Sequence, residues 1–323
     1  MKSSLLLGNG LNRLAGAMEL AGLMHSLAGD KRQNHRKTFG DVSSWPLAFE
    51  RIYSERNKNY AEEAVSKSEL KKQLGDCIEK SVSTVKDWPL LSEFTNLPVK
   101  HILTTNYDYN LEKAVNPKFR REKSPEKTKE KLYSLYRKIT PSGQFLREAD
   151  KVVWHIHGEI EASESICLGF EHYCAQMGAM RHFLTKPHEK LPGGPYINRF
   201  LEKPTGALER EADSWLTLFF THHIYIIGLS LSLMEIDLWW LLTYRLQYQL
   251  RHPKITKNKI VYFCPASQEP EAEILELMSA LGLEVRALGL GTKGDDREKW
   301  MAFYRRVFNS IKSDLNEQTD GAD

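Results

Sequence analysis

Four short polar clusters in this chain each follow an apolar run, and their residue types suit ligand binding and proton transfer. The clusters are Gly8 to Asn12, Thr104 to Asp108, His157 with Gly158, and Gly228 to Ser230. Glycines let a backbone approach a phosphate closely, and a histidine titrates near neutral pH, where it can accept a proton from a hydroxyl group or water. If the apolar runs are parallel strands, the clusters converge on one crevice at their carboxyl ends.

The apolar runs alternate with helical patterns, which predicts the architecture that would position the clusters. We expect strands at Ser3–Leu7, Val99–Thr105, Lys151–His157, Ile166–Leu168, Ile224–Ile227, Ile260–Cys264 and Leu283–Leu288. Ser232 and Glu235 are spaced as a capping box, which predicts a helix from there to about Leu250. The series predicts an α/β fold of the Rossmann-like, doubly wound class with a mainly parallel sheet, a helical subdomain and insertions.

Residues 1–312 are expected to form a single domain. Residues 14–97 have mostly helical periodicity and would form a helical layer or subdomain, and 116–150 would be a charged insertion. Within it, residues 118–138 carry nine Lys or Arg against three Glu, which favours an exposed segment. Residues 313–323 form a polar tail, and we expect the chain after Ile311 to be disordered.

Composition narrows the function classes. The chain has 323 residues, 41% of them hydrophobic, and a net charge of +3, too small by itself to argue for nucleic-acid binding. No apolar run is long enough to span a membrane and no signal peptide is apparent, so a cytoplasmic location is expected. The four cysteines form no Cys-x-x-Cys pair, which argues against a structural zinc site or a disulfide framework.

Each cluster also has a purely structural interpretation. Gly8 and Gly10 could form an ordinary strand-to-helix turn, since Arg13 stands where a dinucleotide fingerprint would have its third glycine. Asn106 could be a turn residue and Asp108 a helix N-cap. Gly228 to Ser230 could likewise be a plain turn. Asp237 is expected to cap a helix or face solvent, outside the site.

Taken in order, the four clusters resemble the motifs of the sirtuin family. Gly8 to Asn12 is similar to the Gly-Ala-Gly phosphate loop, with Asn9 replacing Ala and Asn12 replacing Ser, and Thr104 to Asp108 is similar to Thr-Gln-Asn-Ile-Asp. His157 matches the catalytic histidine, and Gly228 to Ser230 resembles the Gly-Thr-Ser segment. The resemblance implies that Asn106 and His157 are catalytic. It implies an NAD-binding set of Gly8, Asn9, Gly10, Asn12, Thr105, Asp108, Gly158, Gly228 and Ser230.

Two departures refine the resemblance. The four-cysteine zinc module and the Pro-Asp-Phe-Arg loop of deacetylase sirtuins are missing, and what remains looks like the bacterial sirtuin-like domains of antiphage defence. That likeness implies NAD as substrate, no metal, and hydrolysis to nicotinamide and ADP-ribose. Because no second sensor domain is apparent, we expect activation by a separately encoded sensor or activator protein, or by homo-oligomerisation. Nucleic acid would be contacted only indirectly or through residues 118–138.

Two other function classes remain open at this stage. A regulatory module could bind NAD or ADP-ribose without turnover, and a protein deacylase or ADP-ribosyltransferase would need a groove for a peptide. Release of nicotinamide from NAD distinguishes the first class from a hydrolase, and formation of acyl-ADP-ribose identifies a deacylase.

Overall fold

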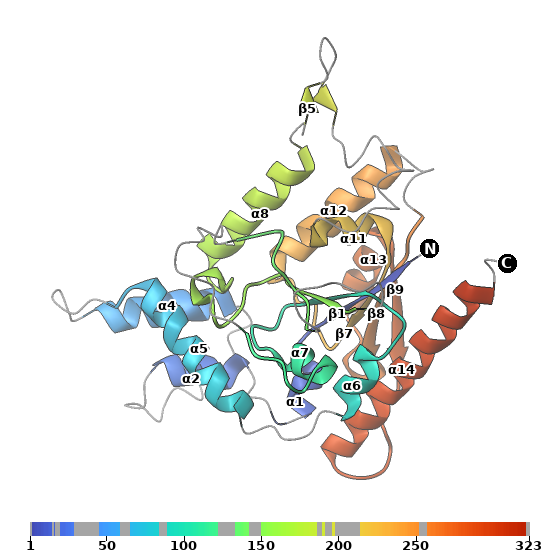
Figure 1. Ribbon diagram of the computed structural model, residues 1–323, viewed down its shortest axis with the longest axis horizontal. Helices are drawn as coiled ribbons and strands as arrows, with labels where there is room; N and C mark the ends of the chain where they lie inside the picture. The colour runs from blue at the N-terminus through green and yellow to red at the C-terminus, as the bar shows by residue number, and fades with distance from the viewer. Residues whose placement is uncertain are drawn as a thin grey trace.

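A seven-stranded sheet forms the centre of the protein in the computed structural model (Figure 1). The structure describes residues 2–14, 16, 20–28, 45–58, 65–83, 89–121, 133–141, 150–185, 189–190, 196–197, 214–251 and 257–320. The strands of the sheet are β1 (Ser3–Leu7), β2 (His101–Thr104), β3 (Lys138–Ile139), β4 (Val152–His155), β7 (His223–Ile227), β8 (Ile260–Pro265) and β9 (Leu283–Leu288). A separate pair consists of β5 (Glu189–Lys190) and β6 (Tyr196–Ile197).

The strand order identifies the fold class. Across the sheet the order is β3-β4-β2-β1-β7-β8-β9, and every pairing is parallel except that of β3 with β4. The chain therefore runs outward from β1 through β2 to β4 and returns to β7 on the other side of β1. Numbered along the chain, the six parallel strands have the order 3-2-1-4-5-6 of a Rossmann fold. The predicted α/β, doubly wound class is confirmed.

Four strands of this sheet end in register. Leu7 is paired with Thr104 on one side and with Ile227 on the other, and Thr104 is paired with His155. The polar clusters predicted from the sequence begin just after these positions. The parallel register therefore brings them to one edge of the sheet, with the reversal of strand order between β1 and β7 at its centre.

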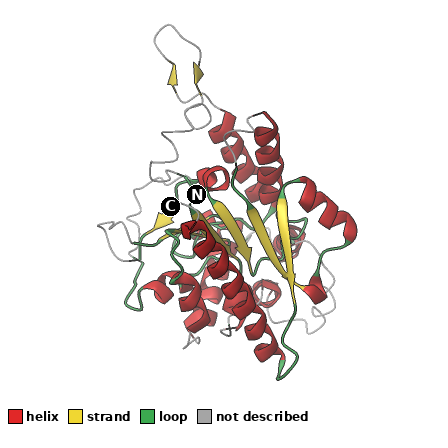
Figure 2. Cartoon of the chain, turned by 90° about the vertical axis from the view of Figure 1, so that its right-hand side faces the viewer, coloured by secondary structure: helices red, strands yellow, loops and turns green. Residues whose placement is uncertain are grey.

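Helices cover both faces of the sheet (Figures 1 and 2). Leu6 of β1 packs into a core with α8 (Phe170–Thr185), α11 (Trp215–Thr221), α12 (Ile236–Arg251) and α13 (Ala272–Ala280). Leu5 and Leu7 face the opposite core, formed with α1 (Gly10–Leu14), α6 (Pro89–Thr95), α7 (Asn110–Val115) and α14 (Asp296–Asp320). This alternation along an all-buried strand is expected for a sheet covered on both sides. No helix in the described part of the chain is long and apolar enough to cross a membrane.

A third core lies beyond the sheet, in the predicted helical region. It joins α2 (Leu20–Ala28), α4 (Trp45–Asn57) and α5 (Lys67–Ser83) with Ile166 and Leu168 of the segment after β4. The expected helical subdomain therefore contains these three helices, whereas α6 packs on the sheet instead. Residues 29–44, 59–64 and 84–88 of this region lie outside the described residues.

Three expectations about the elements are wrong. Residues 312–320 continue α14 because Ile311 and Leu315 are buried and Gln318 accepts a hydrogen bond from Ser3, so this part of the tail is not disordered. Residues 166–168 form no strand; the Cys167 amide instead donates to the carbonyl of His157. Helix α12 begins at Ile236, immediately after Glu235, so Ser232 and Glu235 do not form the predicted capping box.

The basic insertion, which is the Lys- and Arg-rich segment 118–138 of the predicted charged insertion, is anchored in the core near both of its ends. Arg121 and Arg137 form ion pairs with Glu159 at 2.9 and 2.8 Å, and the Tyr109 hydroxyl donates to the same carboxylate at 2.7 Å. Arg137 and Glu159 are buried, so the expectation of an exposed segment fails there. Residues 122–132 and 142–149 lie outside the described residues.

Burial opposes ionisation of Glu159, but His155, Arg121 and Tyr109 outweigh it and lower its pKa to about 2.

We predict that Glu159→Gln destabilises the protein by about 3 kcal/mol at pH 7, since it leaves the buried Arg137 without its carboxylate. The folded pKa of Glu159 lies below the unfolded value, so its contribution is complete above about pH 5 and declines as the pH falls toward 2. Urea unfolding of the wild-type protein and the Glu159→Gln variant at several pH values measures this difference in stability. A stability difference that does not shrink on acidification would contradict the assignment.

Candidate functional site

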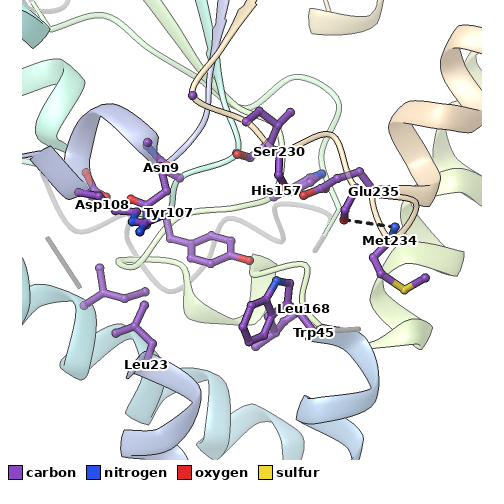
Figure 3. A pocket seen from close by; sticks show the side chains of 18 of the residues that line it. Asn9, Leu23, Trp45, Tyr107, Asp108, His157, Leu168, Ser230, Met234 and Glu235 are labelled. Atoms are coloured by element: carbon purple, nitrogen blue, oxygen red, sulfur yellow. Dashed lines mark hydrogen bonds between the residues drawn. The ribbon is translucent and has the colours of Figure 1, made fainter. Parts of the chain in front are cut away.

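A cavity of about 310 Å³ opens at the carboxyl ends of the strands, at the low end of the roughly 300–1,000 Å³ of ligand pockets (Figure 3). Asn106 and His157, the two predicted catalytic residues, both line it. Six of the nine predicted binding residues also line it: Asn9, Gly10, Thr105, Asp108, Gly228 and Ser230. The site residues are thus brought together from loops that are distant in sequence.

Two glycine loops meet at the centre of this edge. The Gly8 amide donates to the carbonyl of Ile227, and the Gly10 amide donates to the carbonyl of Gly228, both at 2.9 Å. A Cβ atom at Gly8 would lie 2.5 Å from the Gly228 oxygen, and one at Gly10 would lie 2.9 Å from the Gly228 Cα. Gly228 itself has a φ of 64°. The glycines are therefore required by the contact between the loops, whatever ligand binds beside them.

Asn106 is held against this junction by the end of β2. Its backbone amide donates to the Thr104 hydroxyl at 3.0 Å, and its side-chain nitrogen donates to the carbonyl of Gly8 at 3.3 Å. The Thr104 hydroxyl in turn donates to the carbonyl of Leu7. Asn106 is only 9% exposed. Its amide group is consequently oriented by the neighbouring strand while it still borders the cavity.

Asp108 lies one residue before Tyr109, the N-cap of α7, so it is not the N-cap that the structural interpretation predicted. One carboxylate oxygen accepts from the amide of Asn110, the first residue of α7, and the other accepts from the Asn12 side chain, each at 2.9 Å. The carboxyl group also lines the cavity, and burial raises its pKa to about 6. Asn12 is 1% exposed and does not line the cavity, so the structure places it as support for Asp108.

His157 forms a buried pair with Asp237. Its Nε2 atom lies 2.9 Å from Asp237 Oδ2, and the two residues are 2% and 0% exposed. Burial disfavours the imidazolium, but the charge and hydrogen bond of Asp237 favour it more, so the pKa of His157 is raised. The expectation that Asp237 caps the helix or faces solvent is wrong: α12 begins one residue before it, and its buried side chain contacts His157 without lining the cavity. An acidic residue beside Leu238 and Trp239 was the available signal, because a buried charge needs a partner.

Glu235 adds a second carboxyl group beside this pair and lines the cavity. Burial raises its pKa to about 7, with His157 opposing the shift and Asp237 adding to it. His157, Glu235 and Asp237 each offer one ligand atom, and these atoms lie within 4.8 Å of one another, which is compatible with a bound cation. The expectation that no metal is used therefore remains a prediction.

Two further predicted residues, Gly8 and Gly158, shape the site without lining the cavity. Gly158 has a φ of 96°, and a Cβ atom there would lie 2.3 Å from the Ser165 carbonyl oxygen, so the chain turn after β4 requires a glycine. The four sequence clusters did not include most of the apolar wall of the cavity. Its members include Leu23, Trp45, Ile78, Tyr107, Leu168 and Met234.

Helices α2, α4 and α5 contribute Leu23, Trp45 and Ile78 to that apolar wall, and Figure 3 shows Trp45 and Leu23 opposite Ser230 and Asn9. The Tyr107 side chain extends between the two sides, and its hydroxyl donates to the carbonyl of Cys167. The cavity therefore has a polar side, formed at the strand ends, and an apolar side, formed by helices. Such a surface suits a ligand with both charged groups and planar rings.

The strand order, glycine junction and cavity define a Rossmann-like protein with a pocket at the switch point of its sheet. A family model described as a SIR2-like domain matches residues 100–243. The chain therefore contains a SIR2-like, that is sirtuin-like, domain, which fits NAD-related enzymatic activity. The matched range includes Asn106, His157 and Asp237 but not the Gly8 loop. No curated protein matches the chain.

We predict that Gly8→Ala destabilises the protein by about 1–3 kcal/mol, because the new methyl group would overpack the junction with Gly228. Gly178→Ala is the matched control, since Gly178 is exposed within α8 and its Cβ would meet nothing within 4 Å. There the substitution should stabilise the helix by about 0.5–1 kcal/mol. Urea unfolding measures the free energy of unfolding of both variants. Equal changes in stability in the two variants would argue against the proposed constraint at Gly8.

Proposed function

We propose that this protein is an NAD⁺ glycohydrolase that cleaves the nicotinamide–ribose bond and acts in the cytoplasm as an effector of antiphage defence by NAD depletion. The observation that carries the proposal is that Asn106 and His157 line one cavity beside the Gly8–Gly228 junction. The SIR2-like match over residues 100–243 supports NAD as the ligand class. The spacing of the cysteines, which lacks a zinc module, supports hydrolysis over acyl-lysine chemistry.

In the proposed reaction, the oxygen of water forms a bond to C1′ of the nicotinamide ribose while the N-glycosidic bond breaks. The bond's electron pair passes to the pyridinium nitrogen, which leaves as neutral nicotinamide, and one proton of the water is released. Asn106, oriented by Thr104 and Gly8, would position the ribose and the water. His157 would accept the proton. The products are nicotinamide and ADP-ribose.

Control of the activity forms part of the proposal. Continuous cleavage of NAD would deplete the cell that makes the protein, so the enzyme is held inactive until a separately encoded partner or self-assembly activates it. Activation in this scheme completes or opens the cavity. A test of turnover therefore includes the protein at a range of concentrations and with proteins encoded by neighbouring genes.

We predict that the activated protein releases nicotinamide and ADP-ribose from NAD⁺ in equal amounts. Asn106→Ala and His157→Ala should each reduce the rate by at least about 100-fold, the usual contribution of a positioned acid–base group. His182→Ala is the control, because His182 is exposed on α8 and does not line the cavity. Product chromatography and thermal melting of each variant provide the measurements.

The possible outcomes separate the function classes. Full turnover in both the Asn106 and His157 variants would refute the mechanism. Saturable NAD binding without turnover, by calorimetry under every activating condition, would identify a binding module instead. Formation of acyl-ADP-ribose from an acylated peptide would identify a deacylase.

A further inference from the structure

We propose that Asp237 is a positioning residue that holds His157 in the tautomer whose Nδ1 atom accepts the proton from the cavity. This inference rests on the proposed hydrolase for its role in turnover. The pairing of the two side chains does not depend on that function. In this role the buried Asp237 carboxylate of α12 acts in the site, although Asp237 lies outside the four sequence motifs.

Asp237 is held in place from two helices. It lies in the first turn of α12, where the helix dipole stabilises a negative charge. Its Oδ2 atom accepts from Gln176 Nε2 of α8 at 2.8 Å and lies 2.9 Å from His157 Nε2. The side chain is fully buried, so its orientation is determined by these contacts rather than by solvent.

The hydrogen bond determines the tautomer. An ionised carboxylate can only accept, so His157 Nε2 must carry the hydrogen and Nδ1 must be the unprotonated nitrogen of the neutral ring. Among the described residues, Nδ1 of His157 has no hydrogen-bond partner, and the residue lines the cavity. Nδ1 is therefore the nitrogen available to a water molecule or ribose hydroxyl.

A second histidine two residues earlier provides an internal comparison. His155 is also fully buried against a carboxylate, with Nε2 2.7 Å from Glu112 Oε1, but its Nδ1 lies 3.0 Å from the Asn106 carbonyl oxygen. Both of its ring nitrogens are thus occupied, and it does not line the cavity. Each pair joins the Nε2 atom of a histidine to a carboxylate, yet only that of His157 leaves a ring nitrogen for the substrate.

The groups around His157 indicate how the pair should titrate. Asp237 and Glu235 approach from α12 and the segment before it, Tyr173 of α8 packs edge-on with ring centroids 5.6 Å apart, and Tyr107 and Cys167 lie nearby. Burial raises the pKa of both tyrosines and of the cysteine well above their ordinary values, so these three groups stay neutral near pH 7. The two carboxyl groups therefore control the charge on His157.

The His157–Asp237 pair also accounts for the proton that the reaction releases. As water bonds to C1′ and the glycosidic electron pair leaves with nicotinamide, the released proton moves to Nδ1 of His157. The resulting imidazolium keeps its Nε2 hydrogen bond to Asp237, whose negative charge stabilises it. The proton then passes to solvent after the products leave, which restores the neutral ring.

The first test compares Asp237→Asn with Glu112→Gln, which alters the matched pair at His155. We expect Asp237→Asn to lower kcat by at least about tenfold, with KM changed less than about threefold. The acid limb of its pH–rate profile should move to lower pH, because removing the carboxylate lowers the pKa of His157. Glu112→Gln should leave the position of that limb unchanged even if it lowers the melting temperature.

If the acid limb of the pH–rate profile does not move in folded Asp237→Asn protein, the proposal is overturned. So would loss of wild-type turnover on chelation with EDTA and its recovery with Zn²⁺ or Mn²⁺, because His157, Glu235 and Asp237 would then be metal ligands.

The second test needs neither turnover nor a variant at Asp237. Nitrogen-15 NMR of the histidine-labelled full chain reports the tautomer of each ring, with His157 assigned by the signal lost in His157→Gln. We expect a protonated Nε2 and an unprotonated Nδ1 for neutral His157. A protonated Nδ1 overturns the proposal. The expected tautomer without NAD turnover under any condition would instead count against the proposed hydrolase while the pairing stands.

Discussion

The contact between two glycine loops at the reversal point of the sheet is the constraint on which the rest of the site depends. Gly8 and Gly10 donate their amides across to the carbonyls of Ile227 and Gly228 at 2.9 Å. This approach leaves no room for a Cβ atom at either glycine of the first loop. The junction joins the two halves of the sheet, and the Asn106 side chain is anchored to it. The junction therefore lies at the edge of the sheet where the cavity opens, and Gly10 and Gly228 line that cavity.

Around the end of β4, alternate positions bury ionisable side chains that recruit partners from different parts of the chain. His155 pairs with Glu112, His157 with Asp237, and Glu159 with Arg121 and Arg137. A buried charge without a partner is costly, so these pairs favour one arrangement of α7, α12 and the basic insertion around the strand. The middle pair borders the cavity, and the flanking pairs hold the structure on either side of it.

The sheet and the convergence of the motifs were predictable because both arise from local pattern. Apolar runs such as Ser3–Leu7 indicate buried strands, and a parallel sheet brings the loops after its strands to one edge. Element ends were less predictable. Helix α14 extends to Asp320 because Leu315 packs into the core, and α12 begins at Ile236 despite a capping pattern at Ser232. In α14 tertiary contacts outweighed the local preference.

By itself, the sequence determined the six parallel strands, the glycines, and the presence of Asn106 and His157 at strand ends, since each depends on residues close together in the chain. Only the tertiary structure decided which histidine has a free ring nitrogen, that Asp237 faces inward, and that helices from residues 20–83 contribute to the apolar wall. The physical reason is that these features arise from contacts between segments that are far apart in the chain, such as His157 with Asp237, which are 80 residues apart. Local periodicity carries no information about such partners.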